Sequence, residues 1–195
     1  MKIAIIDYGA GNVQSVLFAL ERLGYKGILT QDAAVISNAD RVIFPGVGEA
    51  GTAMEKLRGS GLDKTIPQLK QPVLGICLGM QLLCNYSEEG NTAGLGVFDA
   101  SARKFPSQLK APQMGWNTIY NLRSALFDGI SENEYIYLVH SYFVPLCSLA
   151  IAATDYGQEY ASALQKDNFF GVQFHPEKSG KAGERILGNF LKLEL

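Results

Sequence analysis

The sequence predicts an α/β fold, with a single three-layer domain over residues 1–195 and a largely parallel central sheet. Short apolar runs alternate with helical stretches in the first half of the chain, which is typical of a parallel sheet with helices on its faces. A chain of 195 residues is short for two separate cores. Its hydrophobic content of 47% is sufficient for one substantial core.

The first half supplies the elements of the parallel sheet. Strands are expected where apolar residues form short runs, and helices where they recur every three or four residues. These patterns predict strands over residues 2–7, 26–30, 41–44 and 72–76, a helix over 12–23, and an amphipathic stretch over 51–70.

The second half has a different pattern. Residues 94–120 and 134–168 alternate apolar with polar side chains and are interrupted by Pro and Gly, which predicts additional antiparallel or mixed strands. A last helix is expected over residues 182–193. Its apolar face, which should pack on the sheet, consists of Ile186, Leu187, Phe190 and Leu191.

The charge pattern argues against several classes of partner. Net charge is -2, the sequence pI is near 5.7, and the basic residues are scattered, so no basic stripe is available for nucleic acid. The apolar run at the N-terminus is too short for a signal peptide, and no other run approaches the length that crosses a bilayer. We therefore expect a cytoplasmic protein that binds neither nucleic acid nor membrane.

One of the three cysteines lies in a distinctive frame. Cys77 follows an apolar run and is flanked by Gly75 and Gly79 in a G-x-C-x-G pattern. This is the cysteine form of the nucleophile elbow, in which glycines avoid collisions at a sharp turn from strand to helix. We expect an exposed sulfur at a helix N-terminus, a position that favours the thiolate. A buried structural cysteine is the alternative, and the two glycines argue against it.

The other two cysteines lack such a frame. Cys84 is predicted to be a core residue within the helix that follows the elbow, and Cys147 has no chemical neighbours in sequence. The three cysteines form no CxxC pair and have no metal-ligand spacing with the histidines, so free thiols and no metal site are expected.

A thiol nucleophile needs a base, and only His140 and His175 are available. His175 ends an apolar run in the tripeptide His175-Pro176-Glu177. We expect an extended backbone across Pro176, which would point His175 and Glu177 to the same side, where the carboxylate can orient the imidazole. A polar loop after a strand is the alternative for the tripeptide alone, but the elbow cysteine favours a triad.

The oxyanion of amide hydrolysis needs hydrogen-bond donors. The Leu78 N–H, at the start of the elbow helix, is the first candidate. The second is the loop over residues 45–48, because adjacent parallel strands end at the same edge of a sheet and this loop follows such a strand. A plain turn is the alternative for that loop.

Together these motifs resemble the class I (triad) glutamine amidotransferases. GICLGMQ and QFHPE are specific to that superfamily, while PGVG, PQMGWN and VHSY are similar to the glutaminase subunits of imidazole glycerol phosphate synthases. The similarity covers nearly the whole chain, from IIDYGAGN to QFHPEKSG. It implies a flavodoxin-like class I glutamine amidotransferase fold with additional antiparallel strands.

The resemblance also implies residue roles. Cys77 would be the nucleophile, His175 the general base and acid, and Glu177 the orienting carboxylate. The oxyanion hole would comprise Gly46, Val47 and Leu78, and the glutamine site Gln81, Glu89, Ser141 and Tyr142. His140 would lie in the wall of the glutamine site, and a hydrogen-bonded histidine at a strand end is the alternative.

The implied partner is the cyclase subunit, which is a (β/α)8 barrel and forms a heterodimer with the glutaminase. Ammonia would pass through a channel to the cyclase, which forms imidazole glycerol phosphate and AICAR in histidine biosynthesis. No metal or organic cofactor is implied. The matching interface positions are Asn12, Met114, Trp116, Tyr137 and Lys178, although Trp116 and Tyr137 fit a core position equally well.

Three other functions compete with this interpretation. The chain could serve a class I amidotransferase with a different acceptor synthase. A stand-alone cysteine peptidase or amidase would hydrolyse its substrate without a partner. A non-catalytic binding module would lack a reactive Cys77, although the sequence retains all three candidate triad residues.

Overall fold

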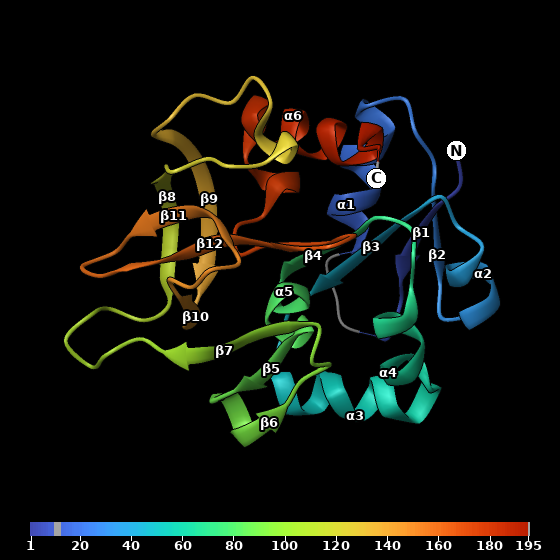
Figure 1. Ribbon diagram of the computed structural model, residues 1–195, viewed down its shortest axis with the longest axis horizontal. Coiled ribbons are helices and arrows are strands. Elements are labelled where there is room, and N and C mark those ends of the chain that lie inside the picture. Colours follow the sequence, from blue (N-terminus) through green and yellow to red (C-terminus); the bar gives the residue numbers. More distant parts are fainter. Residues whose placement is uncertain (10–12, 195) are drawn as a thin grey trace.

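Eleven strands form one mixed sheet within residues 1–9 and 13–194, the part of the chain that the computed structural model describes. Their order is β2-β1-β3-β4-β13-β12-β10-β7-β5-β6, with β11 paired to β12 (Figure 1). The five strands from β2 to β13 run parallel. They are β1 (Ile3–Ile6), β2 (Gly27–Thr30), β3 (Arg41–Gly46), β4 (Val73–Cys77) and β13 (Phe169–Val172).

The sheet continues beyond β13 with mainly antiparallel pairs, although β5 and β7 run parallel. These strands are β5 (Cys84–Ser87), β6 (Thr92–Ala93), β7 (Phe98–Lys104), β10 (Tyr142–Pro145), β11 (Ala150–Asp155) and β12 (Glu159–Lys166). A separate antiparallel pair consists of β8 (Gln113–Ile119) and β9 (Glu134–His140). The parallel half and the additional antiparallel strands were both predicted from the apolar patterns.

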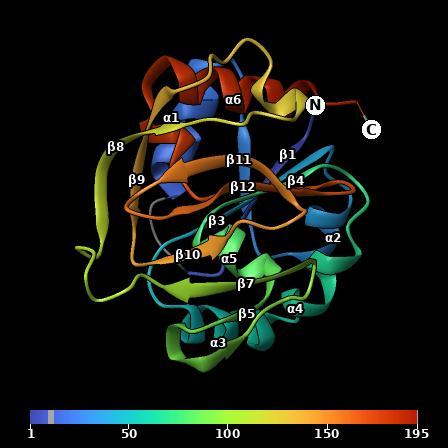
Figure 2. The same cartoon turned by 60° about the vertical axis from the view of Figure 1, so that its left-hand side comes forward.

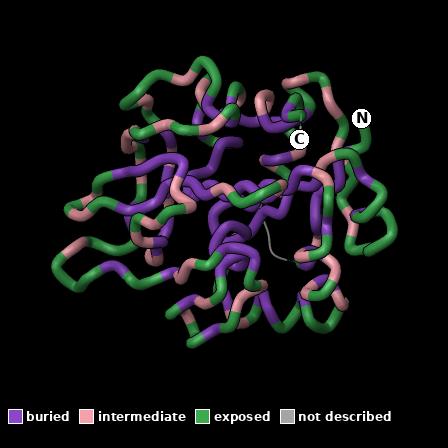
Figure 3. Tube along the Cα trace, viewed as in Figure 1, coloured by how far each residue is buried: buried purple, intermediate pink, exposed green. Residues whose placement is uncertain are grey.

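Helices cover both faces of the parallel half, so the domain has three layers (Figures 1 and 2). On one face, α1 (Val13–Arg22) and α6 (Gly180–Lys192) contribute to one buried cluster. On the other, a second cluster includes residues of α2 (Ala33–Ser37), α3 (Ala50–Ser60), α4 (Leu62–Thr65) and α5 (Leu78–Leu83). Figure 3 shows burial concentrated along the strands between these layers. The predicted apolar face of α6 is confirmed, since Ile186, Leu187, Phe190 and Leu191 are all fully buried.

Four short 3-10 turns complete the described elements, over Ile66–Gln68 (η1), Glu89–Asn91 (η2), Ala125–Phe127 (η3) and Pro176–Lys178 (η4). None of the helices in the described part of the chain is both long and apolar enough to cross a membrane.

The placement of Cys84 within the elbow helix was wrong, because α5 ends at Leu83 and Cys84 begins β5. The carbonyls that a longer helix would use are taken by another segment. Leu82, Leu83 and Cys84 accept hydrogen bonds from the N–H groups of residues 95–97 at 2.8–3.1 Å. Cys84 is nevertheless a core residue, as predicted, and burial raises the pKa of its thiol.

Candidate active site

Cys77 lies at the sharp junction between β4 and α5. Its backbone has φ 53° and ψ −109°, a conformation that costs a residue with a side chain on the order of 1–3 kcal/mol. The flanking glycines make the junction sterically possible. A Cβ on Gly79 would lie 1.9 Å from the Phe44 carbonyl oxygen, and one on Gly75 would lie 2.9 Å from the Met80 nitrogen. The predicted elbow and the steric role of its glycines are therefore confirmed.

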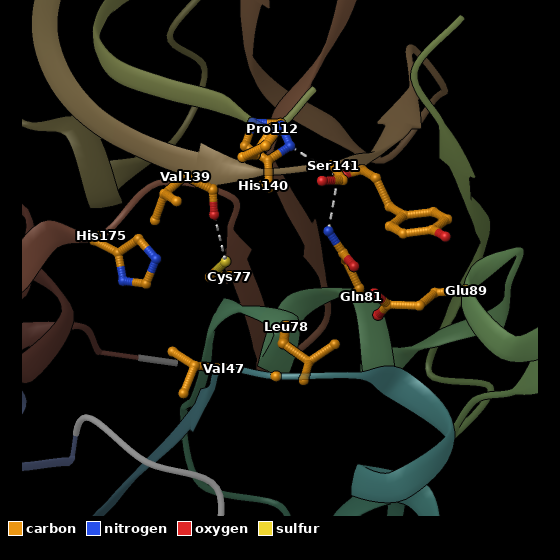
Figure 4. A pocket seen from close by; sticks show the side chains of 12 residues that line it. Val47, Cys77, Leu78, Gln81, Glu89, Pro112, Val139, His140, Ser141 and His175 are labelled. Atoms are coloured by element: carbon orange, nitrogen blue, oxygen red, sulfur yellow. Dashed lines mark hydrogen bonds between the residues drawn. The ribbon is translucent and has the colours of Figure 1, made fainter. Parts of the chain in front are cut away.

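The sulfur is less exposed than expected. Cys77 is only 7% exposed, so the prediction of an exposed sulfur was wrong. The side chain lines a cavity of about 290 Å³ instead, in which strand β9 and the segment that follows it form the opposite wall (Figure 4). A recessed nucleophile of this kind reacts only with substrates that enter the pocket.

His175 lines the same cavity as Cys77. This proximity follows from strand order, because β13 pairs in parallel with β4 and Val172 lies opposite Ile76. The chain just beyond β13 therefore lies beside the elbow at the end of β4. The His175 N–H also donates to the Tyr137 carbonyl at 2.9 Å, which ties this segment to β9.

Glu177 and His175 form a buried pair, with 2.7 Å between Nδ1 and Oε1. Their meeting was predicted, but the expected extended backbone was wrong, since Pro176–Lys178 forms a 3-10 turn. Proline suits the first position of such a turn because its φ is already close to the helical value. Ser179 holds the turn by donating to the His175 carbonyl at 2.7 Å and accepting from the Tyr137 N–H at 2.9 Å.

The pair sets the proton chemistry of the imidazole. Burial alone would lower the pKa of His175, but the neighbouring Cys77 sulfur and the Glu177 carboxylate raise it to about 10. Because Nδ1 faces the carboxylate, Nε2 is the nitrogen left for chemistry. Nε2 is buried and has no hydrogen-bond partner within the described chain.

The residues predicted to bind substrate meet in this cavity. Gln81, Glu89, Ser141 and Tyr142 all line it, and Figure 4 labels the first three of them. Burial raises the pKa of Glu89, and the negative charge of Glu49 adds to the shift, while a hydrogen bond from the Ala50 N–H opposes it. The cavity lining therefore includes both a carboxyl group, from Glu89, and a thiol, from Cys77.

The predicted oxyanion residues are distributed over two cavities. Strand β3 runs two residues further than predicted, through Pro45 to Gly46, which lies opposite Cys77, so this segment reaches the elbow as strand and the loop begins only at Val47. Val47, Gly48 and Leu78 line the main cavity, whereas Gly46 lines a smaller one beside His175 and Glu177.

His140 also lines the cavity but makes a different set of contacts from His175. Its Nδ1 lies 2.8 Å from the Tyr142 carbonyl oxygen and its Nε2 lies 3.2 Å from the Tyr160 hydroxyl. Burial lowers its pKa to about 4. Both interpretations of His140 apply, since it is at once a wall residue and a hydrogen-bonded histidine at the end of a strand.

Comparison with known proteins assigns the chain to a family. The family described as glutamine amidotransferase class-I matches residues 4–193. The chain belongs to the class-I glutamine amidotransferase family.

Its relatives share the full length of the chain. It is 54% identical to the imidazole glycerol phosphate synthase subunit HisH of Bacteroides thetaiotaomicron, over 99% of this chain and 100% of that protein. It is 48% identical to the HisH subunit of Yersinia pseudotuberculosis, over the same shares of the two chains. A crystal structure of a glutamine amidotransferase has a TM-score of 0.75 at 17% identity, covering 98% of each of the two chains, and supports the fold alone.

Four of the five predicted interface residues of this glutamine amidotransferase lie on β8 and β9 or beside them. Trp116 is opposite Tyr137 in the β8–β9 pair, with 6.0 Å between ring centroids, and the Lys178 ammonium lies 5.9 Å from the Tyr137 ring. Trp116 is 56% exposed and Met114 is 65% exposed, so Trp116 is not a core residue. Asn12 lies outside the described residues.

One buried polar residue at the site was missed. Gln173 is fully buried, and its side-chain Nε2 lies 3.6 Å from the Cys77 sulfur. Its position inside the QFHPE motif, two residues before His175, was the available signal. The histidine and the glutamate of that motif were assigned roles from the sequence, whereas the glutamine was overlooked.

Proposed function

We propose that this class-I glutamine amidotransferase is the glutaminase subunit of an imidazole glycerol phosphate synthase, and that Cys77, His175 and Glu177 carry out the hydrolysis. One observation carries the proposal: a cysteine on a strained elbow shares a pocket with a buried histidine, which is in turn paired to a buried glutamate. The full-length similarity to HisH subunits supports the choice of synthase.

The first half of the reaction releases ammonia. The Cys77 thiol passes its proton to His175, and the thiolate attacks the side-chain carbonyl carbon of glutamine. The C=O electrons move onto oxygen, where the N–H groups of Val47 and Leu78 are the proposed donors. The tetrahedral intermediate collapses, the C–N bond breaks, and His175 protonates the departing nitrogen. The products of this half are ammonia and a γ-glutamyl thioester on Cys77.

The second half regenerates the enzyme. Water attacks the thioester carbon while His175 Nε2 accepts its proton, and the C–S bond breaks to release glutamate. Glu177 keeps Nδ1 protonated and stabilises the imidazolium in both halves. Gln81, Glu89, Ser141 and Tyr142 are proposed to hold the glutamine, since all four line the cavity with Cys77.

The ammonia is proposed to pass to a cyclase subunit bound in a heterodimer at the surface around Met114, Trp116, Tyr137 and Lys178. Large exposed aromatic and methionine side chains are typical of such contacts, and Trp116 and Met114 are both exposed. The cyclase would use the ammonia to form imidazole glycerol phosphate and AICAR. The proposal places the reaction in the cytoplasm, whose reducing conditions keep a catalytic thiol free.

Replacing the nucleophile tests the proposal. In the complex with the cyclase, Cys77→Ala should abolish glutamine-dependent product formation and leave the ammonia-dependent reaction intact. Cys147→Ala is the matched control, because Cys147 is also a free thiol but does not line the pocket. Glutamine turnover that survives in Cys77→Ala would refute the assignment.

Two further measurements separate the competing functions. A stand-alone amidase would hydrolyse glutamine as fast alone as with the cyclase, whereas the proposed subunit should be strongly activated by it. A class I amidotransferase for another acceptor would co-purify with a different synthase, which mass spectrometry of the native complex would identify.

A further inference from the structure

Gln173 has a buried side-chain amide that contacts the candidate nucleophile, Cys77. It lies two residues before the candidate base, His175. It follows β13, has no exposed surface, and its main-chain N–H donates to the Ser162 carbonyl at 2.9 Å. Its side-chain Nε2 donates to the Cys77 sulfur at 3.6 Å, and its Oε1 accepts from Gln81 Nε2 at 2.9 Å. Both ends of the amide are therefore used inside the protein.

The orientation of this amide follows from a main-chain carbonyl. The Tyr142 carbonyl oxygen can only accept a hydrogen bond, so the Gln81 atom 2.8 Å from it must be the NH2 nitrogen. The same NH2 faces Gln173, so the Gln173 atom on that side must be the oxygen. The NH2 group of Gln173 is thereby directed to Cys77.

His140 holds the carbonyl that sets this polarity. Its Nδ1 lies 2.8 Å from the same Tyr142 oxygen and must carry the proton, because a carbonyl cannot donate. Its Nε2 lies 3.2 Å from the oxygen of the Tyr160 hydroxyl, whose proton is donated to Gln113 Oε1 at 2.8 Å. The Tyr142 carbonyl oxygen therefore accepts hydrogen bonds from two side chains, Gln81 and His140. The imidazole is held in place because His140 and Tyr160 are both buried.

The sulfur of Cys77 has neighbours with opposite preferences. The Val139 carbonyl oxygen, at 3.7 Å, is an acceptor and suits a protonated thiol. The Gln173 NH2 is a donor and suits a thiolate, since hydrogen bonds to an ionised acceptor are stronger than those to a neutral one. Of these two contacts, only the amide helps the form that attacks.

We infer that Gln173 is a further catalytic residue, whose amide is oriented through Gln81 and the Tyr142 carbonyl and donates a hydrogen bond that stabilises the Cys77 thiolate. This inference rests on the proposed role of Cys77 as nucleophile. The amide contacts the attacking atom itself, and Gln173 is not among the residues that line the pocket. Its hydrogen bond therefore acts on the reactivity of the sulfur before substrate binds. Other titratable groups near Cys77 are His175, Tyr8 and Tyr160, and all three are retained in the variants described below.

The competing interpretation is that Gln173 only fills space and supports Gln81. Two substitutions separate the two roles. Gln173→Met keeps a side chain of similar length but has neither the donor nor the acceptor. Gln173→Glu keeps the shape and the acceptor for Gln81, but places a carboxylate beside the sulfur. If Gln173 only fills space, Gln173→Glu should lower the reactivity of Cys77 less than Gln173→Met does. If Gln173 donates a hydrogen bond to the sulfur, Gln173→Glu should lower that reactivity more.

The test is alkylation of the full-length chain by iodoacetamide between pH 6 and 9, with the modification of each cysteine followed by peptide mass spectrometry. At pH 7, Cys77 should react about tenfold more slowly in Gln173→Met than in the unaltered chain, and more slowly still in Gln173→Glu. The pH at which its alkylation is half-maximal should rise in the same order. Gln165→Met is the matched control, because Gln165 lies on β12 with its side chain bonded to Ser124 and should leave the rate unchanged.

The other cysteines are internal references. Cys147 is partly exposed and should react equally in every variant, while the buried Cys84 should stay unmodified unless the fold is disrupted. If Gln173→Met exposes Cys84, Gln173→Glu still reports on the donor, since it retains the hydrogen bond from Gln81.

The outcomes distinguish this inference from the proposed function. Equal alkylation of Cys77 in all variants, or a milder effect of glutamate than of methionine, would overturn the role of Gln173 and leave the nucleophile in place. A Cys77 that stays unmodified in the unaltered chain, both alone and with the cyclase, would overturn the nucleophile assignment instead.

Discussion

The two halves of the central sheet position the active site by different physical means. In the parallel half, Cys77 is placed by main-chain contacts so close that Gly75 and Gly79 admit no side chain. In the antiparallel half and the adjoining β9, the opposite wall is placed by side-chain hydrogen bonds that converge on the Tyr142 carbonyl. A larger side chain at a close main-chain contact should disrupt the fold strongly, whereas the loss of one hydrogen bond in the wall should lower stability only in part. The following predictions test this contrast, from the largest expected effect to the smallest.

Gly79→Ala tests the steric half. The new Cβ would lie 1.9 Å from the Phe44 carbonyl oxygen, so β3 and α5 would have to separate. We expect a loss of about 3 kcal/mol or more in the free energy of unfolding, measured by urea denaturation. Gly59→Ala is the control, because Gly59 lies inside α3 and a new Cβ there would meet nothing within 4 Å beyond its own helix in the described part of the chain. This change should stabilise the protein by about 0.5–1 kcal/mol. Similar midpoints for the two variants would contradict the steric account.

Glu177→Gln tests the charge beside the base. The substitution keeps the shape of the side chain but removes the negative charge that holds His175 protonated at Nδ1. Glutamine-dependent kcat in the complex should fall by roughly 100- to 10,000-fold. Glu184→Gln, at the partly exposed Arg22–Glu184 pair, should leave kcat within about twofold. A kcat within tenfold of normal for Glu177→Gln would exclude the proposed triad.

His140→Asn tests the hydrogen-bonded wall through pH. Burial lowers the pKa of His140 to about 4, so between pH 6.5 and 4 the unfolded chain binds a proton that the folded chain does not. The stability supplied by neutral His140 is therefore present above pH 6.5 and falls as the pH drops towards 4, by up to about 3 kcal/mol. Asparagine keeps a donor for the Tyr142 carbonyl but cannot titrate in this range.

The measurement is the free energy of unfolding of both proteins at pH 7 and pH 4.5. The advantage of the unaltered protein over His140→Asn should shrink by about 2–3 kcal/mol at the lower pH. His175 does not confuse the result, because its pKa is raised to about 10 and its contribution is lost only as the pH rises from 6.5 through 10. A pH-independent difference would show that His140 does not stay neutral in the folded protein.

Trp116→Ala should have the smallest effect on the isolated chain. Its side chain is 56% exposed, so truncation should change the free energy of unfolding by less than about 1 kcal/mol. If Trp116 contacts the cyclase as proposed, the same change should weaken binding at least about tenfold in titration calorimetry. Tyr135→Ala is the comparison variant, because Tyr135 is also an exposed aromatic residue but lies on β9 and not on β8. Equal affinities for all three proteins would remove Trp116 from the interface.

Features that depend on neighbouring residues were predicted well. The elbow at Cys77 needs two small residues at set distances from the cysteine, and this requirement is visible in the sequence. The pairing of His175 with Glu177 was also predicted, but through the wrong backbone. A proline can adopt either a turn or an extended conformation, and the hydrogen bonds of Ser179 stabilise the turn.

Features that depend on distant segments were predicted less well. The length of α5 was wrong because residues 95–97 take the carbonyls that would have extended it. The prediction that the Cys77 sulfur is exposed was wrong because the segment at the end of β9 lies across the pocket from the elbow and shields it. Neither segment leaves a signal near the cysteine.

The amino-acid sequence was sufficient to specify the alternation of strands and helices, the frame of the nucleophile and the short motif that contains its base. Steric clashes and backbone preferences act over a few residues, so these features can be read locally. The position of β13 beside β4, which brings His175 and Gln173 to Cys77, emerged only from the folded chain. The choice of strand neighbours depends on burying the whole sheet between its two helical layers, and no short stretch of sequence contains that information.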